Sequence, residues 1–179
     1  MSTWTDLHAT AATATWPTAA LGPRARLRAL AAGLPGAVLV ERVIDAPFED
    51  VWGFIADLER SVPTFDQDVR GLRITDRDGT RLQARAASSW RAGFVPLAFA
   101  IDLEPGWCWM VSRPHLYVVG MAAEPDPDDP GRTRYAHLEG IALRHRLLAP
   151  VARATRGQTR RHVRSDIAGI ARQVTRDDR

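Results

Sequence analysis

The chain contains a single cysteine, no lysine and no long run of hydrophobic residues. Cys108 has no partner for an internal disulfide and no companion thiols for a zinc cluster, which excludes a disulfide framework and agrees with a reducing compartment. No apolar stretch approaches the roughly 20 residues that a membrane-spanning helix needs. The N-terminus has Asp6 and His8 where a secretory signal carries basic residues. These absences predict a soluble, cytoplasmic protein.

The length and composition are those of an ordinary globular protein with one main domain. The chain has 179 residues, of which 45% are hydrophobic and 25% are charged. Residues 1–37 are expected to form an N-terminal extension, rich in Ala and Thr, with a short amphipathic helix that begins at Pro23. This helix either packs on the main domain or serves a partner. Residues 38–179 are expected to form the main domain.

The positive charge is concentrated near the C-terminus. Residues 1–143 hold 14 Arg and 18 acidic residues, a net charge of −4, while residues 144–179 hold 10 Arg and 3 acidic residues, a net charge of +7. The solvated face of one amphipathic helix is the simplest explanation, and an anionic partner is the alternative. No aromatic residues are interleaved with these arginines to stack on bases, so we do not expect a nucleic-acid partner.

The hydrophobic period changes at Asp45-Ala46-Pro47. Residues 38–44 are extended and rich in aliphatic side chains, whereas the apolar residues from Phe48 onward recur at steps of three and four. The pattern predicts a strand that runs into a helix, with Pro47 in the first turn and Asp45 or Ala46 as the capping residue. The segment "DLERSVPTF" is then expected to form a second short helix.

The next part of the sequence predicts a meander of antiparallel strands, because the connections between successive apolar runs are short. Asp78-Gly79 suits a tight hairpin, and the acidic segment "EPDPDDPG" is expected to be a loop before the last strand, "RTRYAHLEGIAL". From about Arg146 the period is that of a long amphipathic helix. The predicted fold class is α+β: a curved antiparallel sheet of about six to seven strands wrapped on the C-terminal helix, with two short helices after the first strand.

The pattern I-x-A-P-x-x-x-V-W-x-x-I-x-D from Ile44 to Asp57, the meander and the final helix resemble the START-like helix-grip superfamily, also called SRPBCC. The resemblance covers residues 38–174. It implies an internal, largely apolar pocket, and its nearest branch is that of the polyketide cyclase/dehydrase and lipid-transport-like proteins. A complete catalytic set of those cyclases does not match this chain, and no ligand run for an iron site is present near the early helices. We therefore expect no metal and no cofactor.

The last predicted strand carries the two candidate catalytic residues, His137 and Glu139. Together with Tyr135 they alternate onto one face, which looks into the pocket in similar proteins. An imidazole and a carboxylate there could move protons during cyclisation or dehydration. The opposite phase, with Ala136 and Leu138 inward, is left open by the sequence.

Further side chains are candidates to line the pocket, because they are large or lie on strand faces that are otherwise built from small residues. The same residues also fit a plain hydrophobic core. The candidate ligand-binding residues are Trp52, Ser88, Trp90, Trp107, Trp109, Met121 and Tyr135.

The leading functional hypothesis is a protein that binds a hydrophobic small molecule, lipid or polyketide-like, between the sheet and the C-terminal helix. A polyketide cyclase/dehydrase that uses His137 and Glu139 is the first alternative, and an acyl carrier protein would then deliver substrate to the basic helix. The second alternative is a regulatory or interaction module that acts through this arginine-rich helix.

Overall fold

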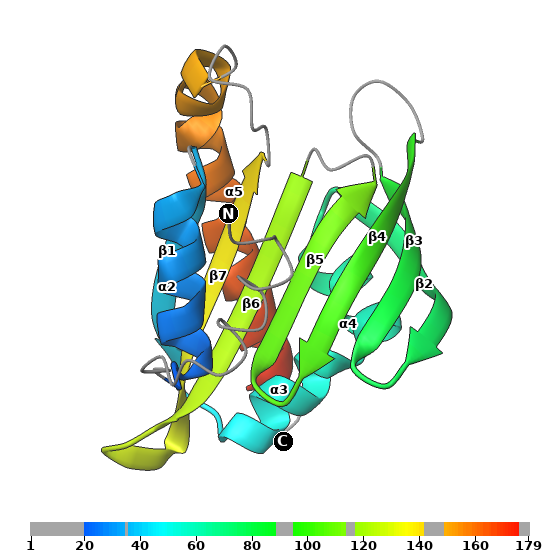
Figure 1. The fold of residues 1–179 in the computed structure, drawn as a ribbon. Helices are drawn as coiled ribbons and strands as arrows, with labels where there is room; N and C mark the ends of the chain where they lie inside the picture. Colours follow the sequence, from blue (N-terminus) through cyan, green and yellow to red (C-terminus); the bar gives the residue numbers. More distant parts are fainter. Residues whose placement is uncertain (1–19, 35, 89–94, 114–116, 142–148, 176–179) are drawn as a thin grey trace, which may run out of the picture.

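The computed structural model describes residues 20–34, 36–88, 95–113, 117–141 and 149–175, and the structural account is confined to them. Seven strands form one antiparallel sheet in the order β1-β7-β6-β5-β4-β3-β2, and four helices pack around it (Figure 1). The strands are β1 Val38–Ile44, β2 Val69–Asp78, β3 Arg81–Ser88, β4 Val95–Glu104, β5 Trp107–Arg113, β6 Tyr117–Asp126 and β7 Asp129–Ile141. The helices are α2 Pro23–Gly33, α3 Phe48–Ala56, α4 Leu58–Phe65 and α5 Ala149–Val174.

The helices lie on both faces of the sheet, so the molecule has three layers. Helix α2 covers one face, over β6 and β7, while α3, α4 and the long α5 cover the other (Figure 1). The predicted α+β fold, with two short helices after the first strand and a long C-terminal helix, is confirmed. Among the described helices, none combines the length and apolarity that crossing a membrane requires.

The corner between β1 and α3 forms where the hydrophobic period changes. Pro47 lies just before the first residue of α3, and Glu49 and Asp50 occupy the first turn, where negative charge suits the helix dipole. The expectation that Asp45 or Ala46 caps the helix is wrong, because Pro47 is the N-cap residue and no side chain caps the helix. The Asp45 carboxylate instead accepts a hydrogen bond from Arg132 Nε at 2.9 Å.

The acidic segment was expected to be a loop, and the structure corrects this. Strands β6 and β7 extend through it until Asp126 pairs with Asp129, which leaves a two-residue turn. Arg134 donates to the acids of this hairpin, at 3.1 Å from Asp126 and 3.0 Å from Asp128. Arg134 therefore offsets part of the charge repulsion between the acids of this hairpin.

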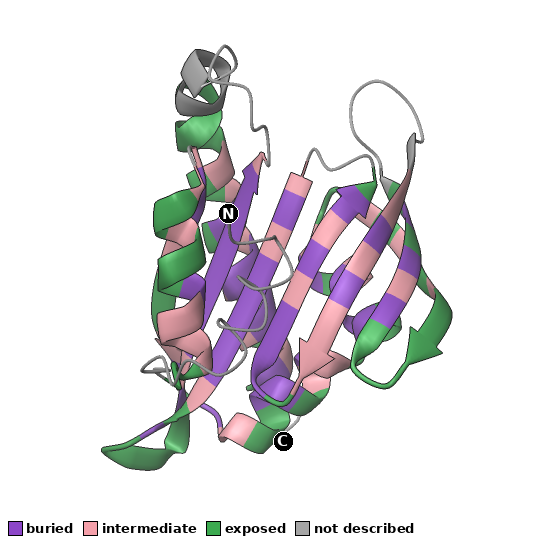
Figure 2. Cartoon of the chain, viewed as in Figure 1, coloured by how far each residue is buried: buried purple, intermediate pink, exposed green. Residues whose placement is uncertain are grey.

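Buried apolar side chains form two separate clusters, one on each face of the sheet (Figure 2). The inner cluster lies between the sheet and α3, α4 and α5, and includes Ile44, Trp52, Phe65, Met121, Tyr135 and Ile167. The outer cluster lies beneath α2 and consists of Leu27, Ala37, Trp107, Val118, Ala122, Ala136 and Leu138. The sheet is thus covered by apolar contacts on both faces along β6 and β7.

Helix α2 is part of this packing. Leu27 is fully buried, and a Cβ on Gly120 of β6 would collide with its side chain. Arg28 donates to Glu41 of β1 at 2.7 Å, and Arg24 lies 3.3 Å from the same carboxylate. Of the two roles considered for this helix, the structure shows packing on the sheet.

Two glycines in α5 provide a matched test of how tightly this helix packs. A Cβ at Gly169 would come within 2.9 Å of Phe65 Cβ and 3.1 Å of Phe65 Cα, whereas nothing lies within 4 Å of the same position at Gly157. We expect Gly169→Ala to lower the free energy of unfolding by about 1 to 3 kcal/mol through overpacking. Gly157→Ala should raise it by up to about 1 kcal/mol, because alanine loses less backbone entropy in a helix. Urea unfolding of both variants checks this, and equal effects would contradict the close approach of α5 to α4.

Candidate functional site

The direction of side chains on β7 decides which residues face the interior. Tyr135 belongs to the inner cluster, whereas Ala136 and Leu138 belong to the outer one. Because side chains alternate along a strand, His137 and Glu139 point to the inner face, toward α5. Of the two phases that the sequence left open, the structure has the one with His137 and Glu139 inward.

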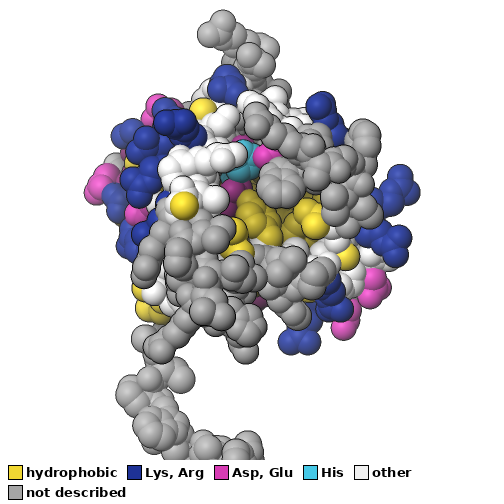
Figure 3. All heavy atoms as spheres, turned by 90° about the horizontal axis from the view of Figure 1, so that it is seen from above, with side chains coloured by type: hydrophobic (Ala, Val, Ile, Leu, Met, Phe, Trp, Pro, Cys, Tyr) yellow, Lys and Arg dark blue, Asp and Glu magenta, His cyan; other side chains and the backbone are white. Residues whose placement is uncertain are grey.

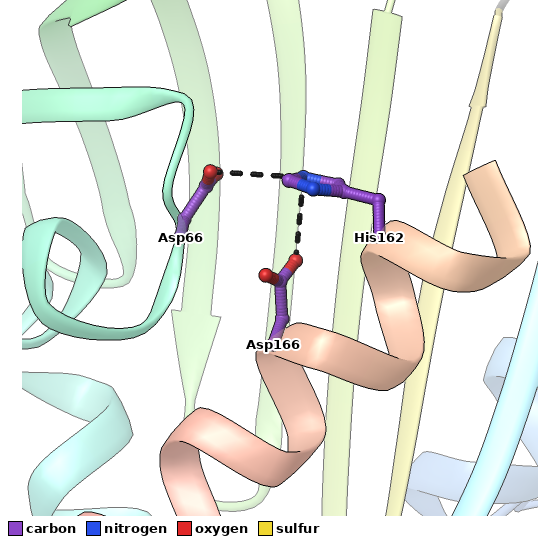
Figure 4. Close-up of side chains that lie close together, drawn as sticks. All are labelled: Asp66, His162 and Asp166. Carbon is purple, nitrogen blue, oxygen red and sulfur yellow. Dashed lines mark ion pairs between the residues drawn. The ribbon is translucent and has the colours of Figure 1, made fainter. Parts of the chain in front are cut away.

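These two residues meet polar side chains from α5 and from the end of α4, and we call the five residues the buried polar cluster: Asp66, His137, Glu139, His162 and Asp166. His162 and Asp166 lie one turn apart on α5, with His162 Nε2 3.4 Å from Asp166 Oδ2. The same nitrogen is 3.6 Å from Asp66 Oδ1 and 3.6 Å from Glu139 Oε1. Figure 4 shows Asp66, His162 and Asp166 pointing toward one another across the gap between α4 and α5. His137 Nε2 lies 3.4 Å from Glu139 Oε1.

The other ring nitrogen of each histidine faces a different oxygen. His137 Nδ1 is 3.1 Å from the Tyr135 hydroxyl, and His162 Nδ1 is 3.9 Å from Asp68 Oδ2. Both rings are therefore oriented with Nε2 toward Glu139. The Tyr135 hydroxyl is within hydrogen-bond distance and holds the His137 ring in this orientation, whereas 3.9 Å is too long for a hydrogen bond between His162 and Asp68.

Three members of the cluster are buried, and some of their polar atoms lack hydrogen-bond partners. His137 is 1% exposed, Glu139 2% and Asp166 1%. His137 Nε2 and both carboxylate oxygens of Asp166 have no hydrogen-bond partner. A buried polar atom without a partner lowers the free energy of unfolding by about 1 to 3 kcal/mol, so this arrangement destabilises the fold.

The environment moves the pKa values of the carboxyl groups in opposite directions. Burial, followed by repulsion from Glu139 and Asp66, raises the pKa of Asp166 to about 9. Burial also disfavours the charged form of Glu139, but contacts with His137, His162 and the Tyr117 hydroxyl outweigh it and lower its pKa. Glu139 is thus the ionised carboxylate at neutral pH, and Asp166 holds a proton when no other cation is present.

The inner face also has an apolar hollow that opens at one end. Along β6, Tyr117 and Val119 are half-buried although their neighbours Met121 and Ala123 are 1% exposed. Leu97 on β4 is half-buried in the same way. Seen from above, hydrophobic side chains gather in a hollow, with a histidine and acidic side chains at its edge (Figure 3). The hollow therefore lies beside polar groups, at the end of the sheet where β6 begins.

The structure places some of the predicted ligand-binding residues on the inner face and others elsewhere. Trp52, Met121 and Tyr135 belong to the inner cluster. Trp90 and the side chain of Ser88 lie outside the described residues. Whether the inner residues contact a ligand stays a prediction.

Trp107 and Trp109 do not line the interior, so this part of the prediction is wrong. Both point to the outer face, where Trp107 belongs to the cluster beneath α2 and the Arg26 guanidinium lies 4.1 Å from its ring centroid. The two indoles stack with centroids 6.3 Å apart. The two residues lie on the same face of β5, as the alternation along the strand implied. Helix α2 covers that face, and the sequence did not show where α2 packs.

Three members of the cluster were not identified from the sequence: Asp66, His162 and Asp166. The i, i+4 spacing of His162 and Asp166 places both on one face of a helix and could have identified this pair. Nothing in the sequence links them to Asp66. Two sets of three residues, Asp66 with His162 and Asp166, and His137 with Glu139 and Asp166, bring their ligand atoms within 4.8 Å of one another, close enough to hold a metal ion.

The fold has clear structural neighbours. The chain aligns with TTHA0849 from Thermus thermophilus at 19% identity and a TM-score of 0.63, over 80% of this chain and 99% of that one. It aligns with the Zhui aromatase/cyclase from Streptomyces sp. R1128 at 14% identity and a TM-score of 0.62, over 80% and 95%. A START superfamily protein from Mycobacterium smegmatis aligns at 15% identity and a TM-score of 0.61, over 77% and 98%. Comparison with family models and with curated proteins gave no match.

These neighbours and the topology define the class of the protein. The seven-stranded antiparallel sheet, the two short helices after β1 and the long α5 constitute a START-like helix-grip fold. The resemblance predicted from the sequence pattern at Ile44 to Asp57 is confirmed at the level of the fold. At these identities the likeness establishes the fold and not an activity.

A thiol-reactivity experiment checks whether the hollow is open to solvent at Val119. Cys108 on the inner face is fully buried, and burial followed by the charge of Asp102 raises its thiol pKa, so we expect no reaction with Ellman's reagent in the native protein. A second thiol introduced by Val119→Cys should react at least about tenfold faster. Both should react rapidly in denaturant. A Val119→Cys thiol as slow as Cys108 would show that the hollow is closed.

Proposed function

We propose that the protein binds a hydrophobic small molecule, lipid or polyketide-like, in the hollow between the sheet and α5. The observation that carries this proposal is the incomplete burial of apolar side chains on the inner face. Leu97, Tyr117 and Val119 are among the half-buried apolar side chains that pack against the inner core, and these three lie at the end of the sheet where β6 begins. An apolar ligand would remove this surface from water, which stabilises the complex by about 25 cal/mol for each Å² buried.

The chemistry of the hollow suits a ligand that is mostly apolar with one polar group. The Tyr117 ring is half-buried, while its hydroxyl lies in the interior beside Glu139. Ligand sites are commonly apolar with a few polar groups that fix the orientation of the ligand. One structural neighbour is an aromatase/cyclase, which supports a polyketide-like ligand as one member of this class.

A bulky side chain at Val119 tests the proposal against a matched variant on the other face. Val119→Trp should fill the hollow and lower the amount of co-purifying apolar ligand at least about tenfold in native mass spectrometry. Val111→Trp, on the outer face of β5, should leave the bound fraction unchanged. Extraction and identification of the bound molecule would give its chemical class. Equal occupancy in the two variants, or an empty wild-type protein that also ignores lipids and polyketide mimics, would contradict the proposal.

A second candidate is an enzyme of the cyclase/dehydrase type that uses His137 and Glu139. The observation in its favour is the close pair itself, with His137 Nε2 3.4 Å from a carboxylate that is ionised at neutral pH. The described part of α5 also exposes Arg160, Arg161 and Arg164. These would suit an acidic acyl carrier protein or another anionic partner.

The two candidates differ in what His137→Ala does. If His137 is a general acid or base, the variant should lose about 100-fold or more in turnover of an acyl-carrier-linked polyketide mimic while ligand affinity stays within a few-fold. Far-UV circular dichroism serves as the control for folding. Unchanged turnover would eliminate the enzyme role for His137, and unchanged turnover at high salt would argue against recruitment through the arginines.

A further inference from the structure

The buried polar cluster has features that ligand orientation and acid/base chemistry do not require. We propose that it is a site for one divalent transition-metal ion, such as Zn²⁺ or Fe²⁺, ligated by His137, Glu139 and Asp166, whose ligand atoms all lie within 4.8 Å of one another. The site joins β7 to α5. Asp66 borders it from the end of α4, as Figure 4 shows. It is independent of the apolar ligand, because its ligands are the polar side chains and not the apolar walls of the hollow.

The spacing of the ligand atoms fits a shared ion better than it fits direct hydrogen bonds. His137 Nε2 lies 3.4 Å from Glu139 Oε1, which is beyond the usual range of about 2.7 to 3.2 Å for a hydrogen bond. The ligand atoms of His137, Glu139 and Asp166 all lie within 4.8 Å of one another. Two atoms that each lie about 2.0 to 2.2 Å from one ion are separated by about 3.0 to 3.6 Å.

The orientation of the His137 imidazole is that of a metal ligand. A ligating histidine commonly uses its second nitrogen to contact a fixed oxygen, which sets the tautomer and the ring plane. Here Nδ1 of His137 faces the Tyr135 hydroxyl at 3.1 Å. Its Nε2 is thereby directed at Glu139.

Unpartnered atoms give an independent indication of a missing ligand. His137 is 1% exposed with Nε2 unpartnered, and Asp166 is 1% exposed with both carboxylate oxygens unpartnered. Within the described part of the chain, the ion pairs of Glu139 and Asp166 are with histidines alone. A cation among these side chains would satisfy all of these atoms at once.

The donor set selects the class of ion. An imidazole nitrogen with carboxylate oxygens suits Zn²⁺, Fe²⁺ or Mn²⁺, whereas Ca²⁺ and Mg²⁺ prefer oxygen ligands throughout. His162 has a side chain that is 22% exposed, which provides a path for the ion to enter. The exposed edge of the cluster is therefore at α5.

The direct test is metal analysis of tag-free protein by inductively coupled plasma mass spectrometry, followed by chelation and calorimetric titration with Zn²⁺. We expect about one equivalent of Zn²⁺ to rebind, and Co²⁺ in its place to give visible d–d bands with nitrogen and oxygen ligands. Mg²⁺ and Ca²⁺ should not compete. Asp166→Asn should weaken Zn²⁺ binding by more than about 100-fold.

The matched control is Asp50→Asn, an exposed acid in the first turn of α3, which should bind Zn²⁺ as the wild type does. Glu139→Gln provides a second variant, should Asp166→Asn fail to fold. No rebinding to the wild type would overturn the proposal, as would Zn²⁺ binding that is equally tight in Asp166→Asn or in a folded Glu139→Gln variant. Either result would mean that these side chains do not form a metal site.

Discussion

The arrangement of the whole interior depends on the phase of β7. Ala136 and Leu138 lie against the apolar underside of α2, so the residues between them must face α5. A shift of one residue would place His137 beneath α2 and Leu138 beside Asp166, which would bury charge on one face and leave carboxylates unpaired on the other. Helix α2 thus helps to set the side-chain direction of a strand on which the candidate site is built.

The same constraint explains why the two faces of the sheet have different chemistry. The outer face is closed by a short helix with one fully buried leucine and by two stacked indoles, one of which lies beneath the Arg26 guanidinium. The inner face is covered by three helices but includes a cluster of carboxylates and imidazoles. Close packing of Gly169 against Phe65 fixes α5 near α4, which brings His162 and Asp166 to Asp66.

A cluster of this kind destabilises a fold unless something compensates its charge, because desolvation of a carboxylate is rarely recovered from one neighbour. Here the compensation is partial, with Glu139 ionised and Asp166 protonated at neutral pH in the absence of a metal. Groups with shifted pKa values are common at functional sites, and their position beside an apolar hollow supports the proposal of a binding site here. The half-buried Tyr117 and Val119 connect the buried polar cluster with the apolar hollow, since both residues line the same end of the inner face.

The sequence alone determined the elements and the fold class, because the hydrophobic periods and turn residues are local. The corner at Pro47, the hairpin at Gly79 and the long final helix each follow from residues close together in the chain. It also identified His137 and Glu139, whose alternation is a property of one strand. Only the tertiary structure decided which face of that strand is inward, that α2 covers Trp107 and Trp109, and that Asp66, His162 and Asp166 join the cluster. These outcomes depend on contacts between segments as far apart in the sequence as Leu27 and Gly120, or Asp66 and His162, and no local pattern records them.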